Sequence, residues 1–180
     1  MSEVVYQSDG PVRLRLERTP VEAAGRKWLQ HRLVVQDGAD GVVAIVVRDG
    51  CLLLVHQYRP AVGESLWELP RGFAEAGDAG ADRQSSANRT AAREVREETG
   101  LELLGCTSIG WLWADSGVLA GAVSVVLGRA DPSAATVGTD EEADDVQWLP
   151  VAAVRDAVSR GVIRDGISLA ALAIWWARES

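Results

Sequence analysis

The sequence predicts a protein of the mixed α+β class, and three observations lead to this prediction. Short segments that are apolar, or that alternate apolar and polar residues, recur between residues 12 and 149, with Gly, Pro and Asp between them, as is typical of β-strands. One segment with helical spacing lies among these strands, and two more follow near the C-terminus. The chain has 180 residues, of which 47% are apolar, so it can bury a substantial core and is not expected to be disordered.

The first part of the chain is predicted to form strands. Residues 12–18 alternate apolar and charged side chains, and residues 27–36 form a second strand after a proline-containing break. Residues 42–47 and 51–59 are almost wholly apolar, as expected for strands that are covered on both faces. The turn at residues 48–50 (RDG) joins these two strands as a hairpin.

The middle of the chain is expected to pass from strand to loop to helix. Residues 66–69 form a short strand that Pro70 ends. The glycine-rich residues 71–85 are predicted to be a loop. A helix then runs from residue 86 or 88 to residue 99, and Gly100 caps its C-terminal end.

The last part of the chain is expected to contain more strands and then two helices. Pro150 opens the first of these helices and Gly161 stops it. The expected elements are strands at 106–114, 121–130 and 146–149, a polar loop over 131–145, and helices at 151–159 and 168–180.

Charge and cysteine content argue against several classes of protein. The net charge of −8 disfavours general binding to nucleic acids or to anionic membranes, because both need a cationic face. The longest apolar run near the C-terminus, residues 169–177, is far too short to span a bilayer, and the acidic N-terminus does not resemble a signal peptide. Cys51 and Cys106 form neither a disulfide framework nor a metal-finger spacing. We therefore expect a soluble cytoplasmic protein in a reducing environment.

The central helix ends in a cluster of like charges. Glu94, Glu97 and Glu98 lie within one arc of about 100° on the helix. Each like-charge pair costs roughly 0.2–0.5 kcal/mol, and carboxylates are unfavourable at a helix C-terminus. One interpretation is a solvated charged face without a specific role. The other is a metal site, because Mg²⁺ and similar hard cations bind a few carboxylates, a carbonyl and waters, and the Gly-rich segment upstream supplies backbone oxygens.

This segment resembles the box motif of the Nudix hydrolases. The family pattern is Gly, five residues, Glu, seven residues, then Arg-Glu-apolar-x-Glu-Glu-x-Gly-apolar, and residues 93–101 (REVREETGL) match the second half completely. In the first half Gly72 is present, Asp78 replaces the usual Glu, and fourteen residues instead of seven follow before the second half. The box therefore spans 72–101 with a seven-residue insertion. A longer helix would keep the phase, but we expect a surface insertion within 79–90.

The resemblance extends beyond the box to the ADP-ribose pyrophosphatase branch, through residues 56–78 and 146–176. It implies a Nudix α/β/α sandwich with a mixed central sheet, plus N-terminal antiparallel strands. It also implies hydrolysis of a nucleoside diphosphate linked to another moiety, such as ADP-ribose or a sugar nucleotide, by water attack on phosphorus with Mg²⁺ or Mn²⁺. Ser116 stands where the branch tends to have Pro, which weakens the assignment to ADP-ribose and leaves other diphosphates open.

By position in the motif, the resemblance implies roles for several residues. Glu94 and Glu98 are the expected main metal ligands, and Glu97 binds a second ion or orients the attacking water. Gly72 offers a carbonyl to the metal. Arg93 holds the glutamates in place, which is a structural role.

In the ADP-ribose branch a late loop supplies a catalytic base, and the acidic run at residues 139–145 falls at this place. Glu142 fits the base best, followed by Asp144 and Glu141. The alternative is a solvated loop tip without a role in catalysis.

Two arginines are candidates for binding substrate. Arg59 matches a position expected near the diphosphate, where a guanidinium suits phosphate oxygens; the alternative is a surface ion pair. Arg71 replaces a residue that is often small in this branch, and it either contacts the substrate or faces water.

The resemblance divides the chain into N-terminal strands over residues 1–40 and a Nudix domain over 41–180. Such strands build a homodimer in the similar branch, and an unpaired sheet edge gives a physical reason for pairing. The alternative function is a nucleotide-sensing Nudix-like domain that binds without cleaving. The intact acids at 94, 97 and 98 argue against it.

Overall fold

The computed structural model describes residues 2–8, 10, 12–131 and 143–179, and in them it confirms the mixed α+β class. The strands are β1 (Glu3–Ser8), β2 (Leu14–Ala23), β3 (Arg26–Val35), β4 (Gly41–Arg48), β5 (Cys51–Arg59), β6 (Glu64–Glu68), β7 (Arg71–Phe73), β8 (Leu103–Leu112), β9 (Val123–Ala130) and β10 (Ala143–Pro150). The helices are α1 (Arg83–Thr99), α2 (Val151–Ser159) and α3 (Gly166–Glu179), with short 3-10 turns η1 (Gln36–Gly38) and η2 (Ala76–Asp78).

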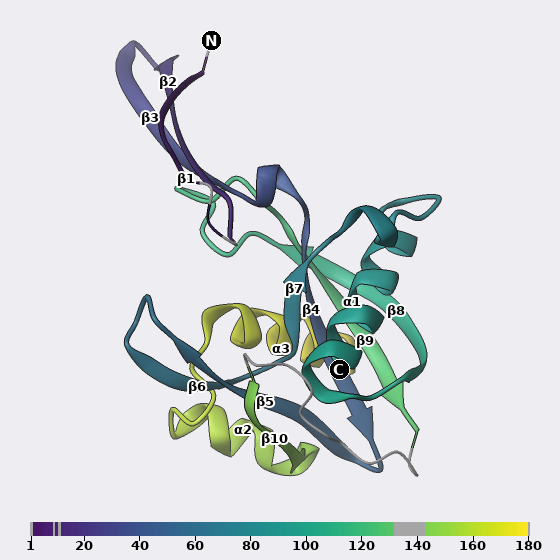
Figure 1. Ribbon diagram of the computed structural model, residues 1–180. Helices are drawn as coiled ribbons and strands as arrows, with labels where there is room; N and C mark the ends of the chain where they lie inside the picture. The colour runs from purple at the N-terminus through teal and green to yellow at the C-terminus, as the bar shows by residue number, and fades with distance from the viewer. Residues whose placement is uncertain (1, 9, 11, 132–142, 180) are drawn as a thin grey trace.

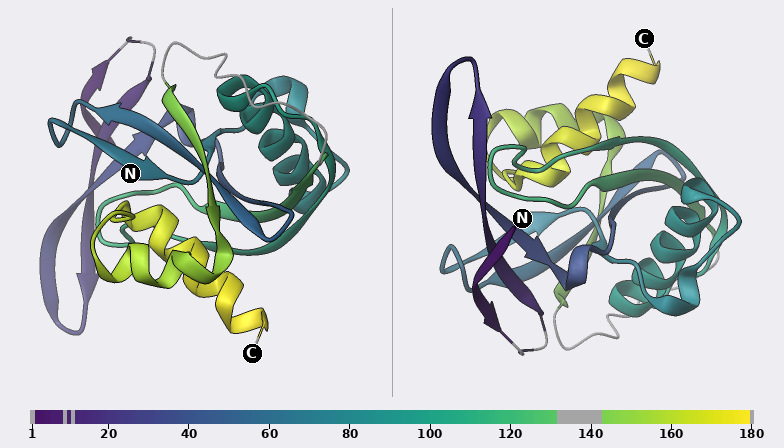
Figure 2. Two further views of the ribbon diagram at one scale, coloured as in Figure 1. Left: turned by 90° about the horizontal axis from the view of Figure 1, so that it is seen from below. Right: turned by 90° about the horizontal axis from the view of Figure 1, so that it is seen from above.

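The central sheet has the strand order β10-β5-β4-β9-β8, with β6 paired to β5 and β7 paired to β4. Strands β4 and β9 run parallel, whereas the other pairs are antiparallel, so the sheet is mixed. Helix α1 covers one face, and α2 and α3 lie together against the other (Figures 1 and 2). This is the α/β/α sandwich that the resemblance implied.

Strand β4 shows why the sheet is covered on both sides. Val42, Ala44 and Val46 face α1, while Val43 and Ile45 face α2 and α3, because successive side chains point to opposite faces of a sheet. All five are at most 2% exposed. Fully burying a valine or isoleucine side chain contributes roughly 1.5–3 kcal/mol, so this strand anchors both layers.

The N-terminal strands form a separate antiparallel sheet of order β1-β2-β3. Figure 1 shows the β2–β3 hairpin extending away from the sandwich. The predicted break at the proline was wrong, since β2 continues through Pro20, which pairs with Leu29 of β3. Strand β1 pairs with β2 only as far as Arg18, so Pro20 lies at an edge where its missing N–H interrupts no second ladder.

The helix that carries the acids begins earlier than predicted. Helix α1 starts at Arg83, and the side chain of Asp82 caps it by accepting a hydrogen bond from the N–H of Ser85 at 2.7 Å. The end is as predicted: Gly100 has φ 72° and donates its N–H to the carbonyl of Arg96 at 2.8 Å. Most of the expected insertion over 79–90 is therefore extra helix, and the expectation of a surface loop there was wrong.

The segment predicted as a loop over 71–85 also contains other regular structure. Strand β7 pairs with the start of β4, and η2 follows it before α1 begins. The hairpin turn at Asp49 and Gly50 is confirmed, with φ 48° and 73°. The boundaries predicted for the helix at 151–159 are also confirmed. In the described residues, no helix has the length and apolar character needed to cross a membrane.

Candidate active site

Helix α1 and strand β7 bring two of the predicted site residues into contact. Gly72, in the middle of β7, lies against the carboxylate of Glu94, and a β-carbon on Gly72 would overlap that carboxylate. Burial raises the pKa of Glu94, while the charge and hydrogen bond of Arg93 oppose this shift. The glycine is therefore required by close approach rather than by backbone conformation.

Glu98 is the most enclosed of the three glutamates. It is 3% exposed, and burial raises its pKa to about 8, helped by the negative charge of Glu94. Its Oε1 accepts a long hydrogen bond of 3.5 Å from Gln57 of β5, and the backbone N–H of Arg71 lowers this pKa in part. Its Oε2 is buried and finds no hydrogen-bond partner among the described residues. A buried carboxylate oxygen without a hydrogen bond costs free energy of folding unless another group binds it.

Arg93 holds the other acids around it. Its guanidinium lies 2.9 Å from Glu94 and 2.7 Å from Glu97, and it donates to the backbone carbonyl of Phe73 at 2.7 Å. It also bonds to the buried carboxylate of Asp78, at 3.0 Å from Nη2. Burial raises the pKa of Asp78, but the hydrogen bonds and charge of Arg93, together with the backbone N–H of Glu75, outweigh it and leave the pKa lowered. Asp78 is thus a partner of Arg93, and it supports the structural role predicted for this arginine.

The two predicted substrate-binding arginines lie together beside Glu98. Arg59 at the end of β5 and Arg71 at the start of β7 both bond to the carboxylate of Glu68, at 2.7 and 2.8 Å. Glu68 is fully buried. Glu68 and Gln57 were not predicted from the sequence. The sequence feature that marks both is a charged or amide side chain within an otherwise apolar strand segment.

The acids are compatible with a divalent cation, although their side chains are not gathered in advance. No three acidic, His or Cys side chains among the described residues stand grouped to hold a metal. Glu94 and Glu97 both turn to Arg93 instead. Two features nevertheless fit a cation. Oε2 of Glu98 has no hydrogen-bond partner among the described residues, and the carboxylate of Glu94 occupies space beside Gly72 that a β-carbon would fill. A cation would favour the charged form of both carboxylates.

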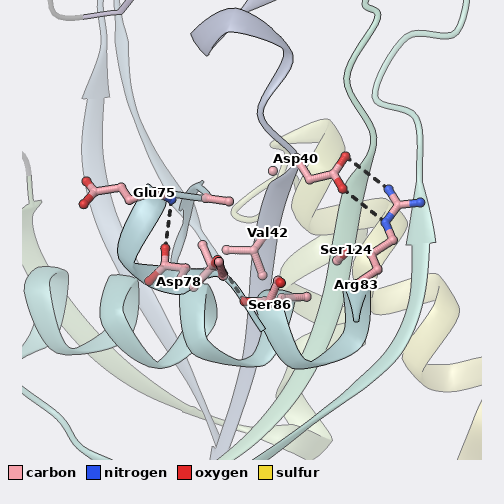
Figure 3. Close-up of a pocket in the computed structure, with 12 residues that line it drawn as sticks. Asp40, Val42, Glu75, Asp78, Arg83, Ser86 and Ser124 are labelled. Carbon is pink, nitrogen blue, oxygen red and sulfur yellow. Dashed lines mark hydrogen bonds and ion pairs between the residues drawn. The ribbon is translucent and has the colours of Figure 1, made fainter. Parts of the chain in front are cut away.

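A cavity of about 450 Å³ lies elsewhere in the described part of the chain. It is placed between the first half of α1 and the starts of β4 and β9, and Figure 3 shows Asp40 and Arg83 paired across it, with their atoms 3.3 Å apart. None of the three glutamates lines it. Its polar groups largely bond to one another, as Asp78 does to the N–H of Glu75 at 3.0 Å. The cavity therefore does not contain the predicted metal ligands.

The candidate bases of the late loop lie at or beyond the limits of the described structure, whereas Ser116 lies within it. Glu142, the predicted base, and Glu141 lie outside the described residues. Asp144 belongs to β10, but its side chain is not among those described. Ser116 lies in the loop between β8 and β9.

Comparison with known proteins gives consistent results. The model of the NUDIX domain family matches residues 38–169. An ADP-ribose pyrophosphatase of Mycobacterium tuberculosis is 34% identical over 160 residues, which cover 86% of this chain and 72% of that protein. An ADP-sugar pyrophosphatase of Mus musculus is 37% identical over 82 residues, 42% of this chain and 34% of that protein. A crystal structure of an ADP compounds hydrolase superposes with a TM-score of 0.76 at 17% identity, over 99% of this chain and 90% of that chain.

Proposed function

The chain belongs to the NUDIX domain family and is a Nudix hydrolase, and on this premise we propose that it cleaves a nucleoside diphosphate linked to a second moiety. Water attacks one phosphorus, and the bond from that phosphorus to the bridging oxygen breaks. Two monophosphates leave, one carrying the nucleoside and one carrying the second moiety. The proton of the attacking water passes to a base.

The observation that carries this proposal is the buried carboxylate of Glu98, which has one unpartnered oxygen and lies near Glu94. Glu94 and Glu98 would hold Mg²⁺ or Mn²⁺, with Glu97 and the carbonyl of Gly72 as further ligands. When bound, such a cation neutralises the charge of the diphosphate and lowers the pKa of water. Hard cations favour this set of carboxylate and carbonyl oxygens.

The other residues have roles that do not depend on the cation. Arg59 and Arg71 bind the diphosphate oxygens, because guanidinium groups form strong charge-assisted hydrogen bonds with phosphate. Arg93 keeps Glu94 and Glu97 on one side of α1, since it bonds to both. Glu142 accepts the proton of the attacking water, as the resemblance implies, and Glu97 orients that water.

The substrate class we propose is ADP-ribose and ADP-sugars. It is supported by the names of the two pyrophosphatases that the chain resembles, and the M. tuberculosis protein matches over most of both chains. Ser116, where the branch tends to have Pro, keeps dinucleotides and other nucleotide sugars in the panel to be tested. The panel is read by release of monophosphate products.

The decisive experiment replaces Glu98 with Gln. Turnover on the best substrate of the panel is expected to fall by on the order of 10²-fold or more, because a neutral amide binds a hard cation poorly. Glu102→Gln is the matched control, since Glu102 lies just beyond α1 with its side chain 75% exposed. EDTA should abolish turnover of the unmodified protein, and Mg²⁺ should restore it. Unchanged turnover in Glu98→Gln with an intact fold would refute the assignment.

We also propose a homodimer formed through residues 1–40. The β2–β3 hairpin exposes apolar side chains, among them Trp28 at 43% and Leu29 at 50%, next to a shallow surface hollow that includes Val21. Exposed apolar side chains on a projecting hairpin give a physical reason for pairing with a second copy. Light scattering at micromolar concentration should give twice the chain mass of 19.2 kDa. Trp28→Glu is expected to shift the protein to monomer, and a wild-type monomer would contradict the proposal.

A further inference from the structure

Glu68 is a buried acid that binds two arginines at once. It ends β6, is fully buried, and each of its two oxygens accepts from a different guanidinium: Oε1 from Nε of Arg59 at 2.7 Å and Oε2 from Nε of Arg71 at 2.8 Å. The two arginine side chains are only 27% and 24% exposed. The two contacts with Glu68 use the inner Nε of each arginine and not the outer Nη nitrogens.

The residues that follow this acid in the chain are bonded to the helical layer opposite α1. Nη2 of Arg71 lies 3.6 Å from Oδ1 of Asp165, just before α3. The other oxygen of Asp165 accepts from the N–H and the hydroxyl of Ser168, both at 2.8 Å. The hydroxyl of Ser168, which is fully buried, accepts from the N–H of Leu69 at 3.0 Å. Leu69 and Arg71, which stand on either side of Pro70, are therefore linked to each other through Ser168 and Asp165.

The same residues adjoin the glutamates of α1. The backbone N–H of Arg71 lowers the pKa of Glu98 in part, and the next residue, Gly72, lies against the carboxylate of Glu94. Gln57, which bonds to Glu98, is two residues before Arg59 on β5, so both side chains point to the same face of the sheet. An anion that reached the glutamates through a bound cation would thus meet both guanidinium groups.

We propose that Glu68 is a positioning residue, which holds the guanidinium groups of Arg59 and Arg71 in place to meet the diphosphate of the substrate. This inference rests on the proposed function and assigns to that site an acid that never touches the substrate. Charge alone gives the opposite expectation: removing Glu68 leaves two unneutralised cations and should attract an anion more strongly. Orientation predicts weaker binding, because each guanidinium must then be ordered by the ligand itself.

The test measures ADP binding by calorimetry in EDTA, where the affinity for the diphosphate depends on the protein's own cations. Glu68→Gln is expected to weaken binding about tenfold, the loss of one charge-assisted contact. Glu17→Gln is the matched control, since Glu17 is also a buried acid bonded to two arginines, Arg15 and Arg32, but in the N-terminal sheet. It should bind ADP as the unmodified protein does. Equal or tighter binding in Glu68→Gln would overturn the inference.

Two further measurements keep the inference testable. Combining Glu68→Gln with Arg59→Ala should weaken binding less than the product of the two single losses, because both changes remove the same contact. If circular dichroism shows that Glu68→Gln is unfolded, Glu68→Asp keeps the charge on a shorter side chain and should weaken binding by a smaller factor. Additive losses, or unchanged binding by a folded Glu68→Asp, would count against the positioning role.

Steady-state kinetics with Mg²⁺ separates this inference from the proposed function. A positioning role raises KM about tenfold while kcat changes less than about threefold, since ground-state binding is what the arginines supply. A wild-type protein that turns over its substrate, with an unchanged KM in Glu68→Gln, overturns the positioning role and leaves the function intact. A wild-type protein that binds ADP but cleaves nothing in the panel overturns the function, and ADP binding then still decides the role of Glu68.

Discussion

The carboxylate of Glu94 lies so close to the α-carbon of Gly72 that no β-carbon fits between them. One residue comes from a short strand and the other from the middle of a helix 22 positions later in the chain. Strand β7 is held by its pairing with β4, and α1 is held by its buried face, so neither element is free to move away. The glycine therefore sets the position of a predicted metal ligand.

Gly72→Ala is expected to displace the Glu94 side chain and to lower turnover by on the order of 10²-fold, as small misplacements in active sites do. The concentration of Mg²⁺ needed for half-maximal activity should rise as well. Gly105→Ala is the control, because a β-carbon there would meet nothing within 4 Å. Equal activity in the two variants would show that the contact has no role in the site.

Asp78→Asn is expected to lower the free energy of unfolding by about 1–3 kcal/mol, since it weakens a buried bond to the charged Arg93. Burial raises the pKa of Asp78, but the hydrogen bonds and charge of Arg93 and the backbone N–H of Glu75 together outweigh this and lower the pKa. The stabilisation is therefore present above the unfolded pKa of about 3.9 and disappears as pH falls through the lower folded pKa. Urea unfolding at neutral and acidic pH measures this, and a difference that persisted in strong acid would contradict it.

Asp82→Ala is expected to destabilise the protein by about 0.5–2 kcal/mol, because it removes the cap of α1. Turnover should not change, since the cap lies at the opposite end of α1 from the glutamates. Asp82→Asn is the control, because asparagine caps helices about as well. A thermal shift assay compares the three proteins. Equal stability of Asp82→Ala would argue that the extra helical turns do not depend on this cap.

Glu17 should make the stability of the N-terminal sheet depend on acid pH. Hydrogen bonds from Arg15, and then from Arg32, lower the pKa of Glu17 to about 2. Its contribution is complete above the unfolded pKa of about 4.3 and is lost between there and about pH 2. The melting temperatures of the unmodified protein and of Glu17→Gln should therefore differ at pH 7 and converge toward pH 2. A constant difference across this range would exclude the ion pairs as its source.

The apolar strands were predicted correctly from the sequence, whereas the start of α1 was not. The unbroken apolar runs of β4 and β5 predicted strands covered on both faces, and the structure confirms this. The start of α1 was misplaced because Gly80, Ser85 and Ser86 are typical of loops. In the fold, the side chain of Asp82 caps the helix, and the Ser86 hydroxyl accepts a bond from the N–H of Gly80. Contacts that only the folded chain makes therefore outweigh the loop propensity of these residues.

The candidate metal ligands could be predicted from the amino-acid order, because the box motif is defined by residue types at fixed spacing along one helix. What only the tertiary structure decided is how the three glutamates differ: Glu98 is enclosed with an unpaired oxygen, Glu94 is held between Gly72 and Arg93, and Glu97 has a side chain that is 45% exposed. Spacing places all three on one face of a helix, but burial and charge at each depend on strands β5 and β7. Those strands come from other parts of the chain, and only packing brings them there.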